Sequence, residues 1–379
     1  MEGVSSFSVP TLTRSAGPSR GLRDRLRAVA DAAVSPLTVD DLLDHFHPLR
    51  KDTELRGRIV SVTAETPESA TVLIKPGKGW TGHVPGQYVR LGVDVDGVRL
   101  WRTYSLTHGP RADRNISITV KAIPGGVVSG HLVHDARAGQ LVHLAPAEGE
   151  FTLPTPLPGK LLMVTAGSGI TPVIGMLRNL FLRATPVEAD IVLVSVNQSE
   201  STAIFRDELR AHAEAGHITL VERYDDRDGL LDVDTLDALV PDFADRLAYA
   251  CGPAGLLDAL EQHHAERGLA LTTERFRPVV LATGPDASGG TVAFEQTGTD
   301  LEVDGATPIL DAAEAAGVLM PSGCRMGICM ACVLPLKEGA VRDLRTGELT
   351  VAVPGETHRD GVPIQTCINT AAGACRINH

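Results

Sequence analysis

Four cysteines near the C-terminal end of this 379-residue chain have a spacing that restricts what this part can fold around. They are Cys324, Cys329, Cys332 and Cys367. Four residues separate Cys324 from Cys329, and two separate Cys329 from Cys332. Cys367 lies much farther along the chain, as does the fourth ligand of a plant-type [2Fe–2S] cluster. Small neighbours such as Gly323 and Gly327 would let the loop wrap closely and point backbone N–H groups at the sulfides. The sequence therefore predicts an iron–sulfur cluster in this region.

A zinc ion held by four cysteines is the alternative for this motif. Structural zinc sites usually have closely spaced ligand pairs at both ends, whereas Cys367 stands alone, so we favour the cluster. Cys375 lies outside the pattern, and we expect it to be a bystander near a mobile terminus. Six cysteines in a chain this long are too few for a disulfide scaffold.

The formal net charge of −12 argues against a nucleic-acid-binding protein, which would concentrate positive charge against phosphates. No apolar run approaches the roughly 18 residues that a membrane-spanning helix needs. The first 30 residues contain several arginines and serines but no apolar segment of the kind found in secretory signals. We therefore expect a cytoplasmic protein with no membrane span and no nucleic-acid partner.

Residue patterns divide the chain into segments of different character. Residues 1–51 are expected to form a helical extension, since Leu22, Leu26 and Val29 share one helical face. Residues 52–155 contain short alternating runs separated by Gly and Pro, which indicate an antiparallel barrel or sandwich. These runs are Ile59–Val62, Thr71–Ile74, Tyr88–Val93, Ile116–Val120 and Leu141–Leu144.

The second half of the chain begins with a different pattern. Residues 156–278 alternate between apolar strand-like runs and helical segments, which argues for a doubly wound parallel sheet. The runs are Leu161–Val164, Ile191–Val196, Ile218–Val221 and Leu247–Ala250. Residues 279–290 are rich in Gly, Ala and Ser and are expected to be a linker. Residues 291–379 form a third domain, with two strands and a helix before the cysteine loop. These are Thr291–Glu295, Leu301–Val303 and Ile309–Ala316.

Three short motifs occur in order within residues 52–155. They are Pro85-Gly86-Gln87-Tyr88, Arg102-Thr103-Tyr104-Ser105 and Gly125-Gly126-Val127-Val128-Ser129. Together they resemble the flavin-binding elements of the ferredoxin–NADP⁺ reductase superfamily. An Arg-x-Tyr-Ser string alone often occurs in an ordinary strand, but three elements in order make a strand without a ligand a poorer explanation. The resemblance implies that FAD binds in this domain.

The residues of these motifs suit a flavin on physical grounds. Arg102 can clamp a pyrophosphate, Tyr104 offers a ring face to the isoalloxazine, and Ser105 can hydrogen-bond near the redox-active nitrogen. The segment from Gly126 to Ser129 would open a short helix whose free N–H groups face the phosphates.

A glycine-rich segment, Ala166-Gly167-Ser168-Gly169-Ile170-Thr171-Pro172, directly follows an apolar strand. Gly167 and Gly169 let the backbone turn tightly and approach a dinucleotide. Thr171 and Pro172 begin the next helix, whose N-terminus favours phosphates. The third glycine of the usual dinucleotide fingerprint is missing, and the Gly-x-Gly-x-Thr-Pro form is similar to the pyridine-nucleotide loop of the reductase superfamily.

The segment Cys251-Gly252-Pro253 follows a predicted strand, at the edge of a parallel sheet where ligands bind. A buried structural cysteine is the default interpretation of Cys251, but the resemblance places it beside the nicotinamide and the flavin. Glu274 and Phe276 resemble, more loosely, the closing segment near the flavin in that family. The resemblance thus implies catalytic roles for Ser105, Cys251 and Glu274.

The resemblance covers about residues 52–379. It implies an antiparallel FAD-binding β-barrel, a doubly wound parallel nucleotide-binding domain and a β-grasp [2Fe–2S] ferredoxin domain, after the short N-terminal helical extension. This order is similar to the reductase components of phenylacetyl-CoA and related oxygenases, and to the flavin–iron–sulfur partners of acyl desaturases. We therefore expect an oxidoreductase that passes electrons from NAD(P)H through FAD and the cluster to a separate metal oxygenase or fatty-acyl desaturase.

Two other functions remain open at this point. One is a self-contained NAD(P)H reductase of small molecules, and the other is a redox-sensing regulator that binds a partner according to the state of flavin and cluster. Residues 291–379 contain eleven acidic and six basic residues, so this domain either steers docking to a basic partner or merely has a solvated surface.

The choice between NADPH and NADH is also open. An Arg or Lys normally holds the 2′-phosphate just beyond the second strand of such a domain, where Ser195, Asn197 and Gln198 stand. Arg206 or Arg223 could still reach the phosphate, which favours NADPH.

Overall fold

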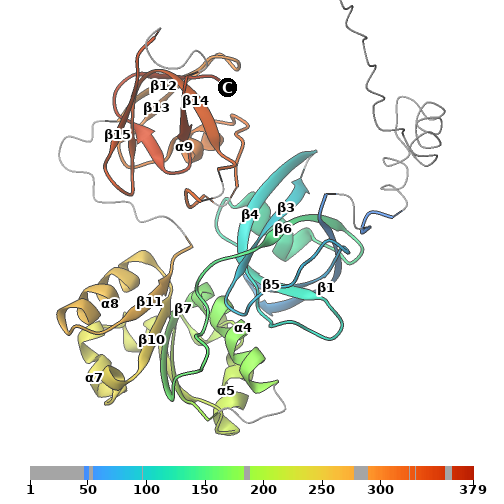
Figure 1. Ribbon diagram of the computed structural model, residues 1–379, viewed down its shortest axis with the longest axis vertical. Helices are drawn as coiled ribbons and strands as arrows, with labels where there is room; N and C mark the ends of the chain where they lie inside the picture. Colours follow the sequence, from blue (N-terminus) through green and yellow to red (C-terminus); the bar gives the residue numbers. More distant parts are fainter. Residues whose placement is uncertain are drawn as a thin grey trace, which may run out of the picture.

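The computed structural model describes residues 47–50, 54–95, 97–182, 188–276, 289–323, 325–328, 330–354 and 361–379. Within these residues the chain forms three sheets that follow one another along the sequence, each with its own buried core (Figure 1). The expected helical extension and the expected linker fall almost entirely outside the described residues.

The first sheet is antiparallel and closes into a barrel. Its strands are β1 (Arg56–Thr66), β2 (Ser69–Pro76), β3 (Tyr88–Val95), β4 (Val98–Ser105), β5 (Ile116–Lys121) and β6 (Leu141–Glu148). They lie in the order β4-β3-β6-β1-β2-β5, and a bridge between Leu106 and Ile118 joins the two edges. Alternate side chains point inward, so Val72 and Ile74 of β2 are fully buried. A helical turn, α3 (Val127–Gly130) with the π-helical η1 (His131–Asp135), packs on this core.

The second sheet has five parallel strands in the order β11-β10-β7-β8-β9. The strands are β7 (Lys160–Ala166), β8 (Asp190–Asn197), β9 (Thr219–Tyr224), β10 (Leu247–Cys251) and β11 (Leu271–Glu274). The helices are α4 (Ile170–Phe181), α5 (Arg206–Glu214), α6 (Asp225–Asp228), α7 (Leu236–Leu239) and α8 (Ala254–Glu266). Short 3₁₀ turns are η2 (Gly167–Gly169), η3 (Glu200–Thr202), η4 (Val233–Thr235) and η5 (Phe243–Asp245).

Successive residues of each strand face opposite sides of this sheet, which therefore has two cores. Met163 of β7 packs in the core that contains Ile174 of α4. Val164, the next residue, packs in the core that contains Leu257 of α8. Helices thus cover both faces, and the doubly wound parallel sheet is confirmed (Figure 1).

The third sheet is mixed and contains seven strands. Its strands are β12 (Gly290–Phe294), β13 (Thr299–Val303), β14 (Val333–Asp343), β15 (Leu349–Ala352), β16 (Val362–Gln365), β17 (Asn369–Ala371) and β18 (Cys375–Ile377). A helix, α9 (Ile309–Ala315), buries Ile309 and Leu310 against Phe294 and Leu336 of the sheet.

One expectation for this domain is wrong. Cys375 was expected near a mobile terminus, but it lies in β18, which pairs with both β12 and β14, and only 5% of the residue is exposed. Burial raises the pKa of its thiol to about 11. Cys375 is therefore a core residue of the sheet, and its apolar surroundings explain its presence without a ligand role.

Candidate functional site

Two of the predicted cluster ligands are brought together by strand pairing. Cys332 precedes β14 and Cys367 follows β16, and these antiparallel strands pair with Val333 opposite Gln365. The two sulfurs lie 3.2 Å apart, and both residues are buried. Ligands of one metal ion can lie at most ~4.6 Å apart when each metal–sulfur bond is about 2.3 Å long. Cys332 and Cys367 are thus close enough to bind the same metal ion.

Cys324 and Cys329 lie outside the described residues, and the ligand roles of all four cysteines stay predictions. Their neighbours Arg325 and Met330 have left-handed backbones, with φ of 59° and 57°, and Gly327 has φ of 74°. A Cβ at Gly327 would lie 2.6 Å from Arg345 Nη1 and 2.8 Å from Ile368 Cδ1. The loop is therefore tightly coiled and closely packed at its glycine, as a wrapping around a cluster requires.

The predicted flavin motif forms the end of strand β4, beside β3. Ser105 pairs with Tyr88, and Tyr104 pairs with Val89. Burial raises the pKa of the Tyr104 phenol. Arg102 Nη1 donates a hydrogen bond to the Trp101 carbonyl at 2.8 Å. Burial, and then the positive charge of Arg325, lower the pKa of Arg102.

The segment from Gly125 to Ser129 forms a tight turn into α3. Gly125 has φ of 70°, and the helix begins after Gly126, as expected. Ser129 Oγ donates to the Gly126 carbonyl at 3.2 Å and accepts from the Ile123 N–H at 3.3 Å. Val128 is buried in the barrel core, whereas Val127 is 53% exposed. In this motif the Val127 side chain therefore faces outward, and the hydrogen bonds of Ser129 stabilise the turn.

The three predicted catalytic residues meet where the barrel adjoins the parallel sheet. Strands β10 and β11 pair with Cys251 opposite Glu274. Burial raises the pKa of Glu274 to about 8, and the Ser105 hydroxyl lies close enough to oppose this shift in part. Burial, reinforced by Glu274, also raises the pKa of the Cys251 thiol. Ser105, Cys251 and Glu274 therefore form one group drawn from two domains, in which Ser105 and Cys251 are buried and Glu274 is partly buried.

Several polar atoms around this group are buried without a hydrogen-bond partner in the described part of the chain. They are Thr103 Oγ1, Ser105 Oγ, Thr165 Oγ1 and Glu274 Oε2. Ser105 Oγ and the Glu274 carboxyl group are close, but neither Ser105 Oγ nor Glu274 Oε2 has a hydrogen-bond partner among the described residues. Unpaired buried polar atoms are costly, and a bound molecule with donors and acceptors would satisfy them. The donor set therefore fits the polar edge of a flavin ring.

Beside this group lies a cavity of about 500 Å³, which is within the usual size range of a ligand site. Predicted residues that line it are Gly167, Gly169, Gly252, Pro253 and Phe276. A Cβ at Gly169 would lie 2.0 Å from the Cys251 carbonyl oxygen, so the two loops can pack together only with glycine there. Thr171 and Pro172 lie in the buried first turn of α4, and Thr171 Oγ1 donates to the Ser168 carbonyl at 2.9 Å.

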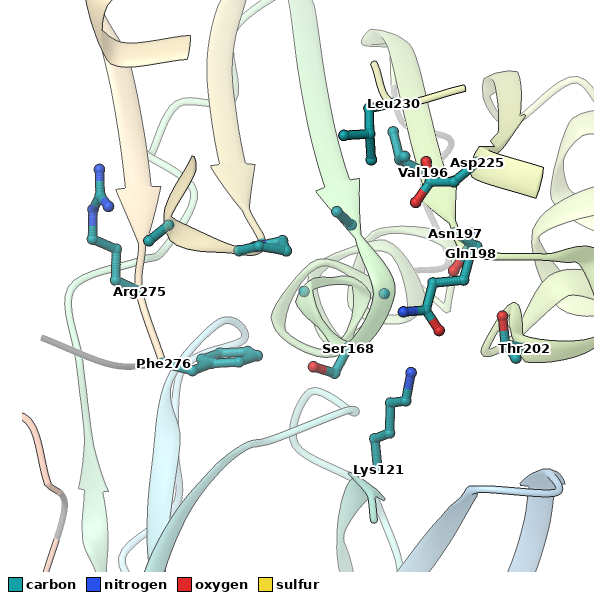
Figure 2. A pocket seen from close by; sticks show the side chains of 16 residues that line it. Lys121, Ser168, Val196, Asn197, Gln198, Thr202, Asp225, Leu230, Arg275 and Phe276 are labelled. Carbon is teal, nitrogen blue, oxygen red and sulfur yellow. The ribbon is translucent and has the colours of Figure 1, made fainter. Parts of the chain in front are cut away.

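The cavity also contains residues that sequence reasoning did not assign to the site. Among them are Lys121, Thr202, Asp225 and Arg275. Figure 2 shows Lys121 extending from the barrel toward Gln198, with Ser168 nearby and the Phe276 ring on the other side. No local motif marks Lys121, because only its place at the end of β5 brings it to the neighbouring domain.

Arg206 and Arg223, the predicted 2′-phosphate ligands, are not among the residues that line this cavity. Arg206 forms ion pairs with Glu200 at 3.4 Å and with Asp207 at 2.9 Å. Arg223 Nη2 donates to the Asp228 carbonyl at 3.0 Å. Both guanidinium groups are therefore engaged by their own neighbours.

Three family profiles match the chain in the order of its three sheets. An oxidoreductase FAD-binding domain matches residues 73–153, an oxidoreductase NAD-binding domain matches residues 163–262, and a 2Fe-2S iron-sulfur cluster binding domain matches residues 292–371. An NADPH oxidoreductase from Mycobacterium tuberculosis H37Rv is 43% identical over 358 residues, covering 92% of this chain and 91% of that protein. The chain belongs to the ferredoxin–NADP⁺ reductase family.

Two more distant proteins are also similar to the chain, one in sequence and one in fold. The ferredoxin reductase component of 3-ketosteroid-9-alpha-monooxygenase from Mycolicibacterium smegmatis is 31% identical over 275 residues, covering 68% of this chain and 77% of that protein. Phthalate dioxygenase reductase has a similar fold, with a TM-score of 0.58 and 22% identity, covering 86% of this chain and 98% of that one.

Family membership confirms the expected fold, cofactors and enzyme class. The chain is an NAD(P)H-dependent ferredoxin-reductase-type oxidoreductase with FAD-binding, NAD(P)-binding and [2Fe–2S]-binding domains. Within the described residues, no helix is long and apolar enough to cross a membrane.

Proposed function

We propose that electrons pass from NAD(P)H to FAD beside Ser105, then to a [2Fe–2S] cluster in the C-terminal domain, and finally to a separate metal oxygenase. The observation that carries this proposal is the meeting of Ser105, Cys251 and Glu274 beside the nucleotide cavity. Transfer between two bound groups requires that both be held close and correctly oriented. A site built from two domains at their junction provides this arrangement.

Residues of the second domain would hold the nucleotide. Gly167 and Gly169 allow the backbone to approach its phosphates, and Lys121 brings a positive charge from the barrel. Gly252, Pro253 and Phe276 also line the cavity. The nicotinamide would then lie toward Cys251, whose high pKa keeps the thiol neutral.

Residues of the barrel would hold the flavin. Arg102 supplies donors for the pyrophosphate, the turn from Gly125 to Ser129 supplies backbone N–H groups, and Tyr104 packs against the ring. When bound, FAD accepts two electrons as a hydride and the cluster carries one electron at a time. With a pKa of about 8, Glu274 is mostly protonated at pH 7, so Glu274 and Ser105 can hold a proton at the ring without adding negative charge.

The cluster ligands are Cys324, Cys329, Cys332 and Cys367 in this proposal. The corresponding division of the chain is a barrel at 52–155, a nucleotide-binding domain at 156–278, a linker at 279–290 and a ferredoxin domain at 291–379, after an extension at 1–51. A cytoplasmic location suits these ligands, because a reducing compartment keeps thiols available to bind iron.

The acceptor is inferred from the relatives. One is the reductase component of a ketosteroid monooxygenase, and another is the glycine betaine monooxygenase reductase subunit of Pseudomonas aeruginosa. An oxygenase is therefore favoured as the acceptor, and a fatty-acyl desaturase is the second candidate. NADPH is favoured as the donor, because the M. tuberculosis relative is named an NADPH oxidoreductase.

The test is reconstitution. The purified protein, loaded with FAD and iron–sulfur cluster, is mixed with NADPH and with oxygenase or desaturase components from the same organism. We expect oxygenase product to form only when the reductase is present. If only the desaturase components form product, the acceptor is a desaturase and not an oxygenase. If the protein reduces ferricyanide but neither set of components forms product, the proposed partner would be contradicted.

A further inference from the structure

A chain of four alternating charges connects the ferredoxin domain to the flavin barrel. Arg102 Nη2 of β4 lies 3.9 Å from Glu314 Oε2 of α9. Glu314 also accepts a hydrogen bond from Arg325, whose Nη1 donates to Asp311 Oδ1 at 2.7 Å. In Figure 1 the loop between α9 and β14 reaches toward β4. The contact thus runs from the cysteine loop through α9 to the predicted flavin clamp.

The position of both carboxylates follows from the pattern of α9. Ile309, Leu310 and Ala313 are buried in the ferredoxin core. Asp311 and Glu314 are three residues apart, so they share a helix face on the side away from that core. Arg325 directly follows Cys324, and its left-handed backbone, unusual for a residue other than glycine, points to a conformation held by its surroundings.

Three of the four charges are partly withdrawn from solvent, whereas the side chain of Asp311 is 49% exposed. The side chains of Arg102, Glu314 and Arg325 are 24%, 27% and 25% exposed. Arg376 and Glu338 of the same domain are also 3.9 Å apart, but their side chains are 54% and 51% exposed. Ion pairs open to water contribute little and are screened by salt, whereas partly buried networks are screened less. The connection to Arg102 is therefore the stronger of the two contacts.

We propose that Glu314 docks the ferredoxin domain on the flavin barrel through Arg102, and that Arg325 links this contact to the cysteine loop. The inference deepens the proposed function, because it rests on the assignment of Arg102 to the flavin and of the cysteines to the cluster. It gives Glu314 and Arg325 a positioning role: they hold the cluster loop toward the flavin while electrons cross within one molecule.

Arg102 can serve both contacts at once. Its Nη1 donates to the Trp101 carbonyl, and its Nη2 faces Glu314 at a distance longer than a hydrogen bond. A guanidinium has five N–H donors, which leaves capacity for a phosphate. Substitution of Arg102 would disturb both roles, so Glu314 is the residue that separates them.

The experiment compares Glu314→Gln with the matched control Glu338→Gln in the FAD- and cluster-loaded protein. Each variant removes one negative charge from the ferredoxin domain, and only Glu314 faces the barrel. Anaerobic stopped-flow mixing with NADPH follows flavin reduction and cluster reduction separately. Small-angle X-ray scattering of the oxidised samples measures the radius of gyration.

In Glu314→Gln we expect flavin reduction to be unchanged and cluster reduction to slow by about three- to tenfold, at 1.4 kcal/mol for each tenfold change. The radius of gyration should rise. In the wild-type protein, salt near 1 M should slow cluster reduction, because the screening length falls to about 3 Å. In Glu314→Gln this salt effect should be much smaller.

One result would overturn the docking inference. The cluster of Glu314→Gln would be reduced at the same rate and with the same salt dependence as in wild type and Glu338→Gln, and the radius of gyration would be unchanged. The absorption spectra of the same samples test the proposed function separately. A wild-type protein that does not bind FAD or the iron–sulfur cluster would contradict the proposed function instead.

Discussion

Replacement of Glu274 by Gln tests the electrostatics of the site in a way that can be calculated. The pKa of Glu274 is raised from 4.5 to about 8 by burial. The folded protein therefore binds this proton more tightly than the unfolded chain does. The associated stability is fully present below pH 4.5 and is lost as the pH rises through 8.

The size of this effect follows from the two pKa values. Between pH 6 and pH 9 the unfolded chain stays ionised, while the folded protein must give up a buried proton. At 1.36 kcal/mol per pKa unit, the free energy of unfolding falls by about 2–3 kcal/mol over this interval. For a unit the size of the barrel and nucleotide-binding domain, this corresponds to roughly 5–10 °C in the unfolding midpoint.

The assay is thermal release of flavin, followed by fluorescence at pH 6 and at pH 9 with one heating rate. The wild-type midpoint should fall by several degrees more than that of Glu274→Gln, because glutamine does not titrate and all other groups are shared. Equal pH dependence in the two proteins would show that Glu274 ionises at an ordinary pH, which would refute the burial argument.

Three further predictions concern individual ligands. Serine at Cys324, Cys329, Cys332 or Cys367 should remove the cluster but leave flavin bound, whereas Cys375→Ser should keep both. Visible absorption spectra of the variants measure both groups. Loss of the cluster in Cys375→Ser, with the cluster kept in Cys367→Ser, would show the ligand assignment to be wrong. Arg102→Ala should weaken flavin binding by roughly 2–3 kcal/mol, the range for charge-assisted contacts; full flavin content after dialysis would count against the clamp. Catalytic efficiency should be higher with NADPH than with NADH, and a clear preference for NADH would contradict the assignment of the donor.

Local motifs made the cofactors predictable from the sequence. The cysteine spacing, the Arg102–Ser105 string and the Gly167–Pro172 loop each carry their chemistry within a few residues. Strands with clear alternation, such as β2, were also predicted. In contrast, β4 and the strands from β14 to β18 were not. Polar residues such as Arg102 and Arg342 interrupt their apolar pattern, and several of them are only three or four residues long.

Contacts between domains could not be predicted from the sequence. Lys121 belongs to the barrel but lines the nucleotide cavity, and Glu314 meets Arg102 across two domain boundaries. Neither relation leaves a periodic or local signal. Arg206 illustrates the opposite case: it was predicted to reach a phosphate, but two nearby carboxylates hold it.

The serial route from flavin to cluster is the central claim, and removal of the ferredoxin domain tests it most directly. A truncated protein that ends at Pro278 keeps the barrel, the parallel sheet and Glu274. The cores of the barrel and of the parallel sheet are separate from the core of the third sheet. It should reduce ferricyanide with NADPH at nearly the full rate, because that reaction needs only nucleotide and flavin. Reduction of cytochrome c should fall steeply, because the cluster is the proposed exit. Cytochrome c reduction as fast as that of the full chain would mean that electrons leave from the flavin, and the serial route would be contradicted.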